Sequence, residues 1–577
     1  MMGALMRVVV LCTLALGVLT SGEEDDRPQV ETQYGKLQGK TLSAKGTDRT
    51  VHAFYGVPFA KPPVGPLRFA PPEPPESWSS VRGASDHAPV CLQDPHILEE
   101  VNIEITLPPV SEDCLYLNIF TPADRLKEEK LPVMVFIHGG ALMMGGAMMF
   151  EGSALSAHEN VVVVSIQYRL GLLGFLSTGD HRAPGNYGFL DQVEALQWVQ
   201  ENIAGFGGDP KSVTIFGESA GGVSVSALVA SPLAKGLFHR AIAESGVAIM
   251  PGLVAQTKEE SVFYSNIVAN ISGCGLDALV DCLKAKSEEE ILSLVVSMTV
   301  PCHLPPSHSN QHVYLFCLQK MFALPASVDG AFFPKAAHQI MADKEVNSVP
   351  FMAGVNNQEF GWILSLAMNI SGFREGIERE AAEEMLKNFP ILGPFRSATS
   401  FLLDEYIEDE TDPAEVRNRL IDLVGDFMFV IPALRTAKYH RDSGHPTYFY
   451  EFQHRPSFFE DSKPDFVKAD HGDELFFVIG GPFLKGDVLF IAGAATEEEK
   501  VLSKAVMRYW ANFARTGDPN GPGLVHWPQY DEDEDYMEIN LKQKAAKQLK
   551  AGKYEFWTHV LPEKMQEAPQ QQQHSEL

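Results

Sequence analysis

The chain has 577 residues and a mass of 63.5 kDa, with 45% hydrophobic, 21% charged and 10% aromatic residues. This composition is typical of a globular protein with a large core, and it excludes a collagen-like, coiled-coil or wholly disordered chain. With 46 basic and 75 acidic side chains, the formal net charge is −29. Such a charge repels phosphate backbones, so we expect no nucleic acid among the partners.

The first residues have the pattern of a secretory signal peptide. Arg7 precedes the apolar run 8–20, and the small residues Ser21 and Gly22 follow it. The run is shorter than the ~20 apolar residues that a membrane-spanning helix needs. We therefore predict that residues 1–22 are a signal peptide that is removed, and that the mature protein is lumenal or secreted.

The last residues resemble an endoplasmic-reticulum retrieval signal, with serine where aspartate is usual. They are His574, Ser575, Glu576 and Leu577. We expect residues 564–577 to form a flexible tail that a retrieval receptor binds, which places the protein in the endoplasmic-reticulum lumen. Secretion is the alternative localisation, and a frayed end without an address is the alternative interpretation of the tail.

Cysteines and glycosylation motifs agree with an oxidising compartment. Of the 7 cysteines, Cys12 lies within the signal peptide, and the others allow several disulfide pairings. Pairing of nearest neighbours would give Cys91–Cys114, Cys274–Cys282 and Cys302–Cys317. Asn-X-Ser triplets begin at Asn270 and Asn369 and predict two N-glycosylation sites.

Short apolar runs alternate with helical patterns along the chain, which favours an α/β fold with a mostly parallel central sheet and helices on both faces. The runs that predict buried strands are Leu131–Ile137, Val161–Ile166, Val213–Phe216, Pro350–Val355 and Thr447–Phe452. Helical spacing of apolar residues predicts a helix near Leu190–Ile203. A second helical pattern runs from Leu502 to Phe513 and ends at Gly517. No linker interrupts the chain, so we expect one catalytic domain over residues 23–563.

A candidate nucleophile follows the third of these strands. Gly217-Glu218-Ser219-Ala220-Gly221 stands between the strand and a helical stretch, which is the arrangement of a nucleophile elbow. The motif alone is weak, because a glycine-rich turn with a surface serine has the same letters. Its position between a strand and a helix makes Ser219 the candidate.

A serine nucleophile needs a base, and the base needs an acid that orients it. In a nucleophile-elbow fold the chain order is serine, acid, histidine. Glu359 follows the strand at 350–355, and His471 lies beyond the strand at 447–452. Three other carboxylates lie close to His471 in sequence and are rival acids that we expect to cap the next helix instead: Asp470, Asp473 and Glu474.

Small residues after the strand at 131–137 predict an oxyanion hole. The sequence there is His138-Gly139-Gly140-Ala141, and backbone N–H groups of Gly140 and Ala141 can approach a developing oxyanion closely. The N–H of Ala220, directly after the serine, would complete the set. An ordinary glycine-rich loop is the alternative for this motif alone.

Two long motifs resemble those of the type-B carboxylesterase family of cholinesterase-like α/β-hydrolases. They are residues 206–222, which include the serine motif, and Glu112–Asn118 (EDCLYLN). The resemblance covers most of residues 28–562 and is strongest to mammalian liver and intestinal carboxylesterases of the second class. It implies an α/β-hydrolase fold, Ser219 as nucleophile, His471 as base and Glu359 as acid. It also implies Gly140, Ala141 and Ala220 as oxyanion donors and the disulfides Cys91–Cys114 and Cys274–Cys282.

The segment at about 298–323 departs from the family pattern and looks like an insertion. It contains Cys302, Cys317 and three histidines, whose spacing fits no common zinc pattern, so we expect no metal there. We expect a surface loop, or a splice or gene-model product, and a metal site is the alternative.

These features together predict a serine hydrolase that cleaves small-molecule carboxylic esters of xenobiotics and lipids through an acyl-enzyme intermediate. Amides and thioesters are further expected substrates, and no cofactor is expected. A cholinesterase is the first alternative, but residues 92–113 contain no Trp that could bind a choline cation. A lipid-ester hydrolase is the second, and a catalytically silent adhesion-type member is the third. The oligomeric state is left open.

Overall fold

The structure is a computed structural model, and it describes residues 27–96, 107–126, 129–299, 324–362, 364–365, 373–484 and 493–567. Several of the predictions fall outside these ranges. They concern the signal peptide 1–22, residues 300–323 of the insertion with Cys302 and Cys317, Asn369, and the retrieval residues 574–577.

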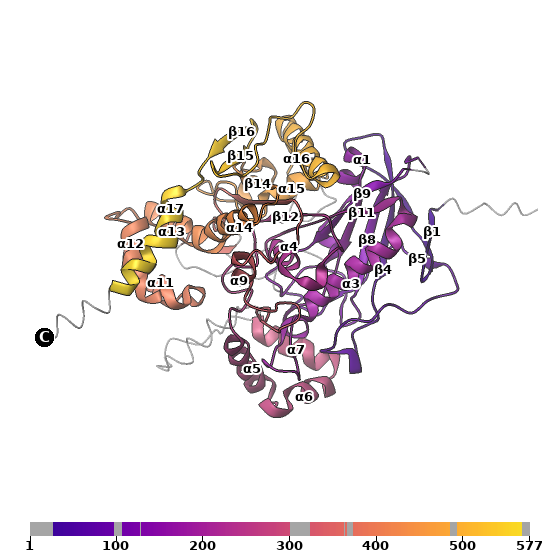
Figure 1. Ribbon diagram of the computed structural model, residues 1–577, viewed down its shortest axis with the longest axis horizontal. Helices are drawn as coiled ribbons and strands as arrows, with labels where there is room; N and C mark the ends of the chain where they lie inside the picture. The colour runs from indigo at the N-terminus through magenta and orange to yellow at the C-terminus, as the bar shows by residue number, and fades with distance from the viewer. Residues whose placement is uncertain are drawn as a thin grey trace, which may run out of the picture.

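An 11-stranded sheet forms the centre of the molecule (Figure 1). In spatial order its strands are β16 (Lys544–Lys547), β15 (Asp535–Ile539), β14 (Thr447–Phe452), β13 (Phe351–Asn356), β12 (Arg240–Glu244), β11 (Gly208–Glu218), β9 (Leu131–Ile137), β10 (Val162–Ile166), β8 (Tyr116–Pro122), β4 (Thr50–Pro58) and β3 (Lys40–Ser43). The strands from β15 to β10 run parallel, whereas β16, β8, β4 and β3 pair antiparallel at the two edges. The predicted mostly parallel sheet is therefore confirmed.

Two small sheets lie outside the large one. They are β1 (Gln29–Thr32) with β2 (Gly35–Gln38) and β5 (Arg82–Gly83), and β6 (Val90–Cys91) with β7 (Val110–Ser111).

Alternate side chains of each central strand belong to different cores, because neighbouring residues of a strand point to opposite faces. In β9, Val133 and Val135 join one buried cluster, and Met134 and Phe136 join the other. This explains why the strands appear in the sequence as nearly continuous apolar runs: both faces of the sheet are covered.

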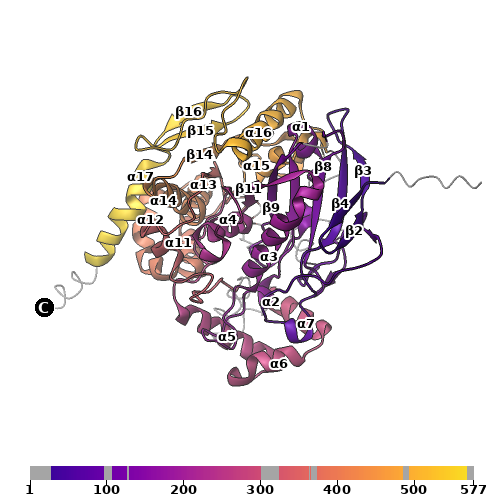
Figure 2. The same ribbon diagram turned by 45° about the vertical axis from the view of Figure 1, so that its right-hand side comes forward.

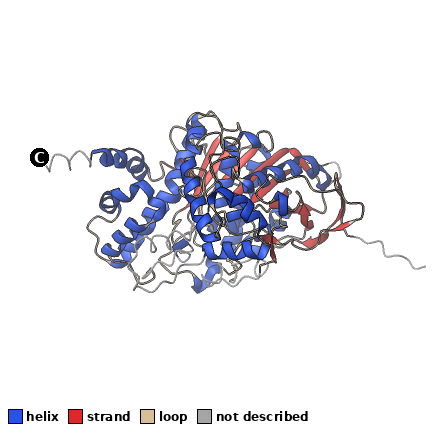
Figure 3. Cartoon of the chain, turned by 90° about the horizontal axis from the view of Figure 1, so that it is seen from below, coloured by secondary structure: helices blue, strands red, loops and turns tan. Residues whose placement is uncertain are grey.

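Helices cover both faces of the sheet, as predicted (Figures 2 and 3). The first cluster includes α3 (Tyr187–Asn202), α4 (Ala220–Ala230) and α14 (Ile431–Asp442). The second includes α1 (Ser153–Glu159), α15 (Asp473–Val478) and α16 (Glu497–Thr516). The other helices are α2 (Gly171–Phe175), α5 (Lys258–Ser272), α6 (Leu279–Ala285), α7 (Glu288–Thr299), α9 (Ala337–Ala342), α11 (Arg379–Asn388), α12 (Thr399–Tyr406), α13 (Pro413–Gly425) and α17 (Ala551–Glu555).

The ends of α16 follow from local chemistry. Thr496 and Glu499 form a reciprocal capping box at its start, and Gly517 takes the left-handed conformation at its end with φ 82°. The predicted stop at Gly517 is therefore confirmed, and the predicted helix near residues 190–203 is the C-terminal part of α3.

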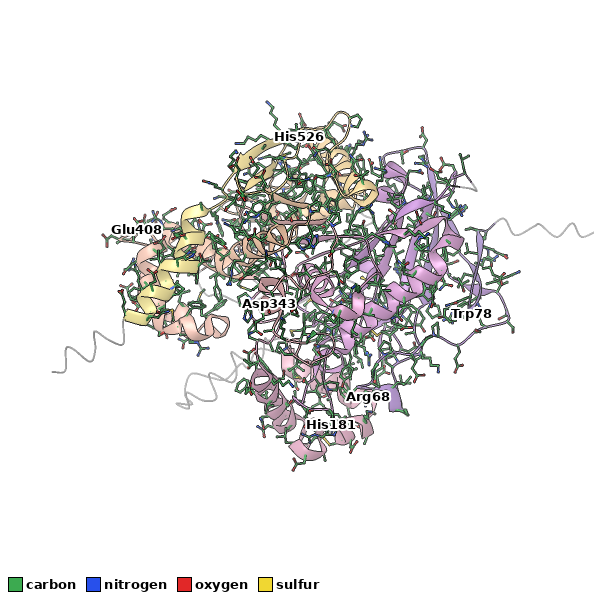
Figure 4. All side chains as sticks on the ribbon, in the orientation of Figure 1. Arg68, Trp78, His181, Asp343, Glu408 and His526 are labelled. Carbon is green, nitrogen blue, oxygen red and sulfur yellow. A yellow bond between two sulfur atoms is a disulfide. The ribbon has the colours of Figure 1, made fainter. Side chains whose placement is uncertain are left out.

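The family motif 112–118 has a structural explanation at its first residue. The buried carboxylate of Glu112 forms an ion pair with Arg68, and the Arg68 guanidinium also donates to the carbonyls of Leu283 and Lys286. Arg68 is labelled beside the α6 region in Figure 4. The pair thus attaches the segment that contains α6 to the loop before β8.

Among the described residues, no single helix has the length and hydropathy to cross a membrane. In that part of the chain, α5 and the helical segment Leu276–Ala285 would qualify only if taken together, and they are bent by 96° relative to each other. The prediction of one domain over residues 23–563 stays a prediction.

Candidate active site

Ser219 occupies a strained turn between β11 and α4. Its backbone has φ 59° and ψ −123°, which a residue other than glycine adopts at a cost of about 1–3 kcal/mol. The Ser219 N–H donates to the carbonyl of Glu244 on the neighbouring strand β12 at 2.9 Å. The structure therefore presents Ser219 at the end of a strand, on a turn that the surrounding sheet holds in place.

Close packing explains a glycine of the serine motif. A Cβ atom at Gly221 would lie 2.0 Å from the carbonyl oxygen of Ile137 at the end of β9. Any larger residue would push α4 away from the sheet and displace the turn. The motif thus requires glycine at position 221 because the first turn of α4 packs directly against the end of β9.

Glu359 and His471 meet at the same edge of the sheet. Nδ1 of His471 lies 2.7 Å from Oε2 of Glu359, and the two side chains are 7% and 0% exposed. Glu359 follows β13, and His471 lies between β14 and α15. The two residues are 112 positions apart, and parallel strands bring them together because their carboxyl ends share one edge of the sheet.

The rival carboxylates beside His471 have other partners. Asp470 accepts backbone hydrogen bonds from Gly361 and Trp362, and Asp473 forms a buried ion pair with Lys463. None of them caps α15, whose N-cap is Gly472 without a side-chain cap bond. The expectation that these carboxylates cap the helix is therefore wrong, because each is bound elsewhere: Asp470 by the loop after Glu359, Asp473 by Lys463, and Glu474 by Ser245 and Asn356.

Glu218 is a site residue that the sequence reasoning did not single out. Its Oε1 lies 3.1 Å from Nε2 of His471, so the imidazole stands between the carboxylates of Glu218 and Glu359. Within the described part of the chain, the partly exposed Ser219 hydroxyl has no hydrogen-bond partner. The available signal was the position of Glu218 in the serine motif, at the last residue of β11.

The two carboxylates dominate the electrostatics of His471. Burial lowers the pKa of His471, but Glu218 and Glu359 outweigh burial and raise the pKa to about 10. Burial also raises the pKa of Glu218 to about 7, although the facing imidazole opposes this. The site is thus built to stabilise an imidazolium ion.

Ser245 and Glu474 lie behind Glu359 and were not predicted as site residues. The Ser245 hydroxyl donates to Oε1 of Glu359 at 2.7 Å and lies 3.1 Å from Oε1 of Glu474. Burial and the nearby carboxylate of Glu359 raise the pKa of Glu474 well above its ordinary value. A protonated Glu474 can therefore donate to Ser245, while Ser245 donates its single proton to Glu359.

The loop after β9 offers free backbone donors. Gly140, Ala141 and Leu142 all have positive φ, at 98°, 55° and 59°. Among the described residues, no acceptor binds the N–H of Gly140 or of Ala141. Ala220 is the first residue of α4, where an N–H has no acceptor within the helix. The three predicted donors are thus available for an external oxygen.

Contacts between His138 and Tyr168 hold the start of this loop in place. The Tyr168 hydroxyl donates to the carbonyl of His138 at 2.8 Å, and the two rings stack at 4.4 Å. Burial lowers the pKa of His138 to about 4, so this imidazole is neutral. A Cβ atom at Gly139 would lie 3.1 Å from Cβ of Ser219, which shows how closely the loop approaches the serine.

The predicted disulfides Cys91–Cys114 and Cys274–Cys282 are both present, with Cα atoms 4.9 and 5.9 Å apart. Asn270 is exposed in the last turn of α5, where a glycan would meet solvent.

One group of carboxylates could approach a metal ion within the described ranges, and it lies at the surface. Asp531, Asp533 and Asp535 offer ligand atoms within 4.8 Å of one another. Lys547 already forms ion pairs with Asp533 and Asp535. The predicted absence of a metal and of a cofactor stays a prediction.

The sequence matches known proteins over almost its whole length. The model of a family described as the carboxylesterase family matches residues 26–557. A medium-chain fatty acyl-CoA hydrolase precursor from Anas platyrhynchos is 48% identical, with 99% of this chain and 98% of the relative covered. A liver carboxylesterase from Sus scrofa is 47% identical, with 99% of both chains covered. A cocaine esterase from Homo sapiens is 46% identical, with 98% of this chain and 97% of the relative covered.

Proposed function

The chain belongs to the carboxylesterase family, and we propose that it hydrolyses carboxylic esters through an acyl-enzyme on Ser219. The observation that carries the proposal is the 2.7 Å contact between Nδ1 of His471 and Oε2 of Glu359. This contact fixes the imidazole with Nε2 toward Glu218, the residue directly before the serine. The strained turn at Ser219 supports the same role, because such strain persists where the surrounding structure serves a function.

The first chemical step uses the neutral form of His471. Oγ of Ser219 attacks the ester carbonyl carbon while Nε2 of His471 takes the serine proton, a step that typically contributes about 10²–10⁴ in rate. The imidazolium that forms lies between Glu218 and Glu359, and both carboxylates stabilise its charge.

The carbonyl oxygen becomes an oxyanion in this step. We assign its binding to the N–H groups of Gly140, Ala141 and Ala220, and each such donor is typically worth about 10²–10³ in rate. His471 then gives its proton to the alcohol oxygen, and the alcohol leaves. Water then attacks the carbonyl carbon of the acyl-enzyme while His471 takes a proton from it. His471 returns this proton to Oγ of Ser219 as the bond between the acyl group and the serine breaks, and the acid leaves.

We propose uncharged aryl and lipid esters as substrates, with thioesters and amides as further candidates. The names of the relatives from Anas platyrhynchos and Homo sapiens support a thioester and a drug-like ester, respectively. Resemblance to the second carboxylesterase class favours small acyl groups with bulky alcohols. Comparing turnover of an acyl-CoA, an uncharged aryl ester and acetylcholine separates this proposal from a cholinesterase.

Replacing Ser219 with Ala tests the proposal directly. We expect ester hydrolysis to fall by about 10⁴-fold and covalent labelling by a fluorophosphonate to disappear. Ser226→Ala is the matched control, because Ser226 lies on α4 and its buried hydroxyl has no partner within the described residues. Wild-type rates in the Ser219 variant would refute the nucleophile assignment, and an unlabelled wild-type enzyme would favour a catalytically silent member.

We also propose that the protein resides in the endoplasmic-reticulum lumen, by way of residues 1–22 and the tail 574–577. Removing the last four residues should shift the enzyme from cells to the culture medium. Unchanged retention would contradict the retrieval signal.

A further inference from the structure

We propose that Asp470 is a positioning residue for catalysis, because its carboxylate holds the loop of Glu359 against the loop of His471. The inference rests on the proposed function, since it assigns a role relative to the Glu359–His471 pair. Asp470 directly precedes His471 and is 1% exposed. Its side chain contacts the other loop.

The contacts of Asp470 span the two loops. Oδ1 of Asp470 accepts a hydrogen bond from the N–H of Gly361 at 2.8 Å and one from the N–H of Trp362 at 3.1 Å. These donors come two and three residues after Glu359. One buried oxygen thus fixes the segment that follows the acid, and charge-assisted bonds of this kind are about twice as strong as neutral ones.

Further hydrogen bonds extend this contact into a seam between the loops. Gln358 donates its N–H to the carbonyl of Ala469 at 3.0 Å, and its Oε1 accepts from the N–H of Lys468 at 2.7 Å. Oδ1 of Asn357 accepts from the N–H of Ala469 at 3.1 Å. The seam pairs the residues just before Glu359 with those just before His471, and Asp470 is its charged member.

The seam leaves no room for a side chain at Gly361. A Cβ atom at Gly361 would lie 2.9 Å from Oδ1 of Asp470 and 2.7 Å from Oε1 of Gln358. Gly361 does not have a positive φ, so the glycine is required by this close approach rather than by its backbone conformation.

The backbone of Asp470 is fixed from the opposite side. Its N–H donates to Oδ2 of Asp473 at 2.7 Å, and the buried carboxylate of Asp473 is in turn paired with Lys463. Asp470 therefore joins two buried groups, with its backbone bound to the Lys463–Asp473 pair and its carboxylate bound to the Gly361 segment. Loss of its oxygen would free the Glu359 loop without touching Glu359 or His471.

The consequence for catalysis is geometric. The 2.7 Å contact between Glu359 and His471 depends on the relative position of two loops that only meet in the folded protein. A displacement of about 1 Å at a catalytic group can cost about 10²-fold in rate. Asp470→Ala is therefore expected to lower kcat by about 10²-fold while KM changes little.

Three variants and a control test the proposal. Asp470→Asn keeps an acceptor oxygen but loses the charge, so it should recover most of the kcat that Asp470→Ala loses. Gly361→Ala displaces the same oxygen from the other side and should lower kcat in the same way. Combined with Asp470→Ala, it should cost less than it does alone, because one of the two oxygens that it displaces is gone while Oε1 of Gln358 remains. Glu112→Gln is the control for a loss of stability without a change at the site. It removes the buried ion pair with Arg68, and both residues are far in sequence from Asp470.

The pH profile provides a readout that a merely structural role would not move. The titratable groups that act on His471 are Glu218, Glu359 and Glu474. Those that interact with Asp470 include Asp473 and Glu218, and Lys463 pairs with Asp473. A loosened Glu359 contact lowers the pKa of His471, so the acidic limb of kcat/KM should move to lower pH in Asp470→Ala. Glu112→Gln should lower the melting temperature without moving this limb.

Rates are normalised to sites titrated with a fluorophosphonate, so that unfolded enzyme does not count. Equal kcat losses in Asp470→Ala and Asp470→Asn would overturn the positioning role and assign the effect to charge. An unchanged kcat in both would overturn it as well. Persistent activity in Ser219→Ala would instead refute the proposed function, which keeps the two failures distinct.

Discussion

Replacing Glu218 with Gln should move the pH dependence of ester hydrolysis. Oε1 of Glu218 lies 3.1 Å from Nε2 of His471, and the side chains are only 12% and 7% exposed. Burial lowers the pKa of His471, but Glu218 and Glu359 together raise it from 6.5 to about 10. An opposite charge at this range typically shifts a pKa by about 1–3 units. We therefore expect the pKa of His471 to fall by about 1–3 units in Glu218→Gln.

The sign follows from the mechanism. His471 must be neutral to accept the serine proton, so activity rises as pH increases through its pKa. Because Glu218 and His471 interact strongly, the acidic limb of the wild-type pH profile of kcat/KM reports the titration of the pair rather than the pKa of one group. In the variant the limb moves to lower pH, while kcat/KM on the alkaline plateau falls because one carboxylate no longer stabilises the imidazolium.

The assay is the pH profile of kcat/KM for an uncharged aryl ester, on which Glu218 can exert no direct charge effect. Glu194→Gln is the matched control. Glu194 lies on α3, and burial and the nearby Glu201 raise its pKa to about 7. A glutamate that titrates in the same range but lies away from the serine should leave the limb in place. An unmoved limb in Glu218→Gln, or one moved to higher pH, would refute the electrostatic reasoning.

Two further variants test the packing and the buried charge of the site. Gly221→Ala should destabilise the fold by at least about 1–3 kcal/mol, because the new Cβ would lie 2.0 Å from the Ile137 carbonyl; denaturant unfolding measures this, and wild-type stability would contradict it. Burial raises the pKa of Glu244 from 4.5 to about 8, although the hydrogen bond from Trp510 opposes this shift. As pH rises, the carboxyl group therefore ionises in the unfolded chain at a lower pH than in the folded protein. Stability should therefore fall as pH rises between these two values, and Glu244→Gln should flatten this dependence in melting curves; equal slopes in both proteins would argue against a protonated Glu244.

The sequence by itself predicted the parts of the site that local patterns encode. The continuous apolar runs located β9, β13 and β14, because strands covered on both faces need apolar side chains at every position. The glycines around Ser219 indicated a tight strand-to-helix turn. The order of Ser219, Glu359 and His471, each beyond its own strand, indicated which side chains a parallel sheet gathers at one edge.

Only the tertiary structure decided what surrounds these residues. The sequence suggested that Asp470 and Asp473 cap α15, but one joins the loop of Glu359 and the other pairs with Lys463. The position of Glu218 beside Ser219 in the motif indicated that it lies near the site, but only the fold places its carboxylate against Nε2 of His471. The physical reason is that a strand or a turn is specified by neighbours along the chain. The partner of a buried carboxylate is specified by loops over 100 residues apart, such as those that join Gly361 to Asp470.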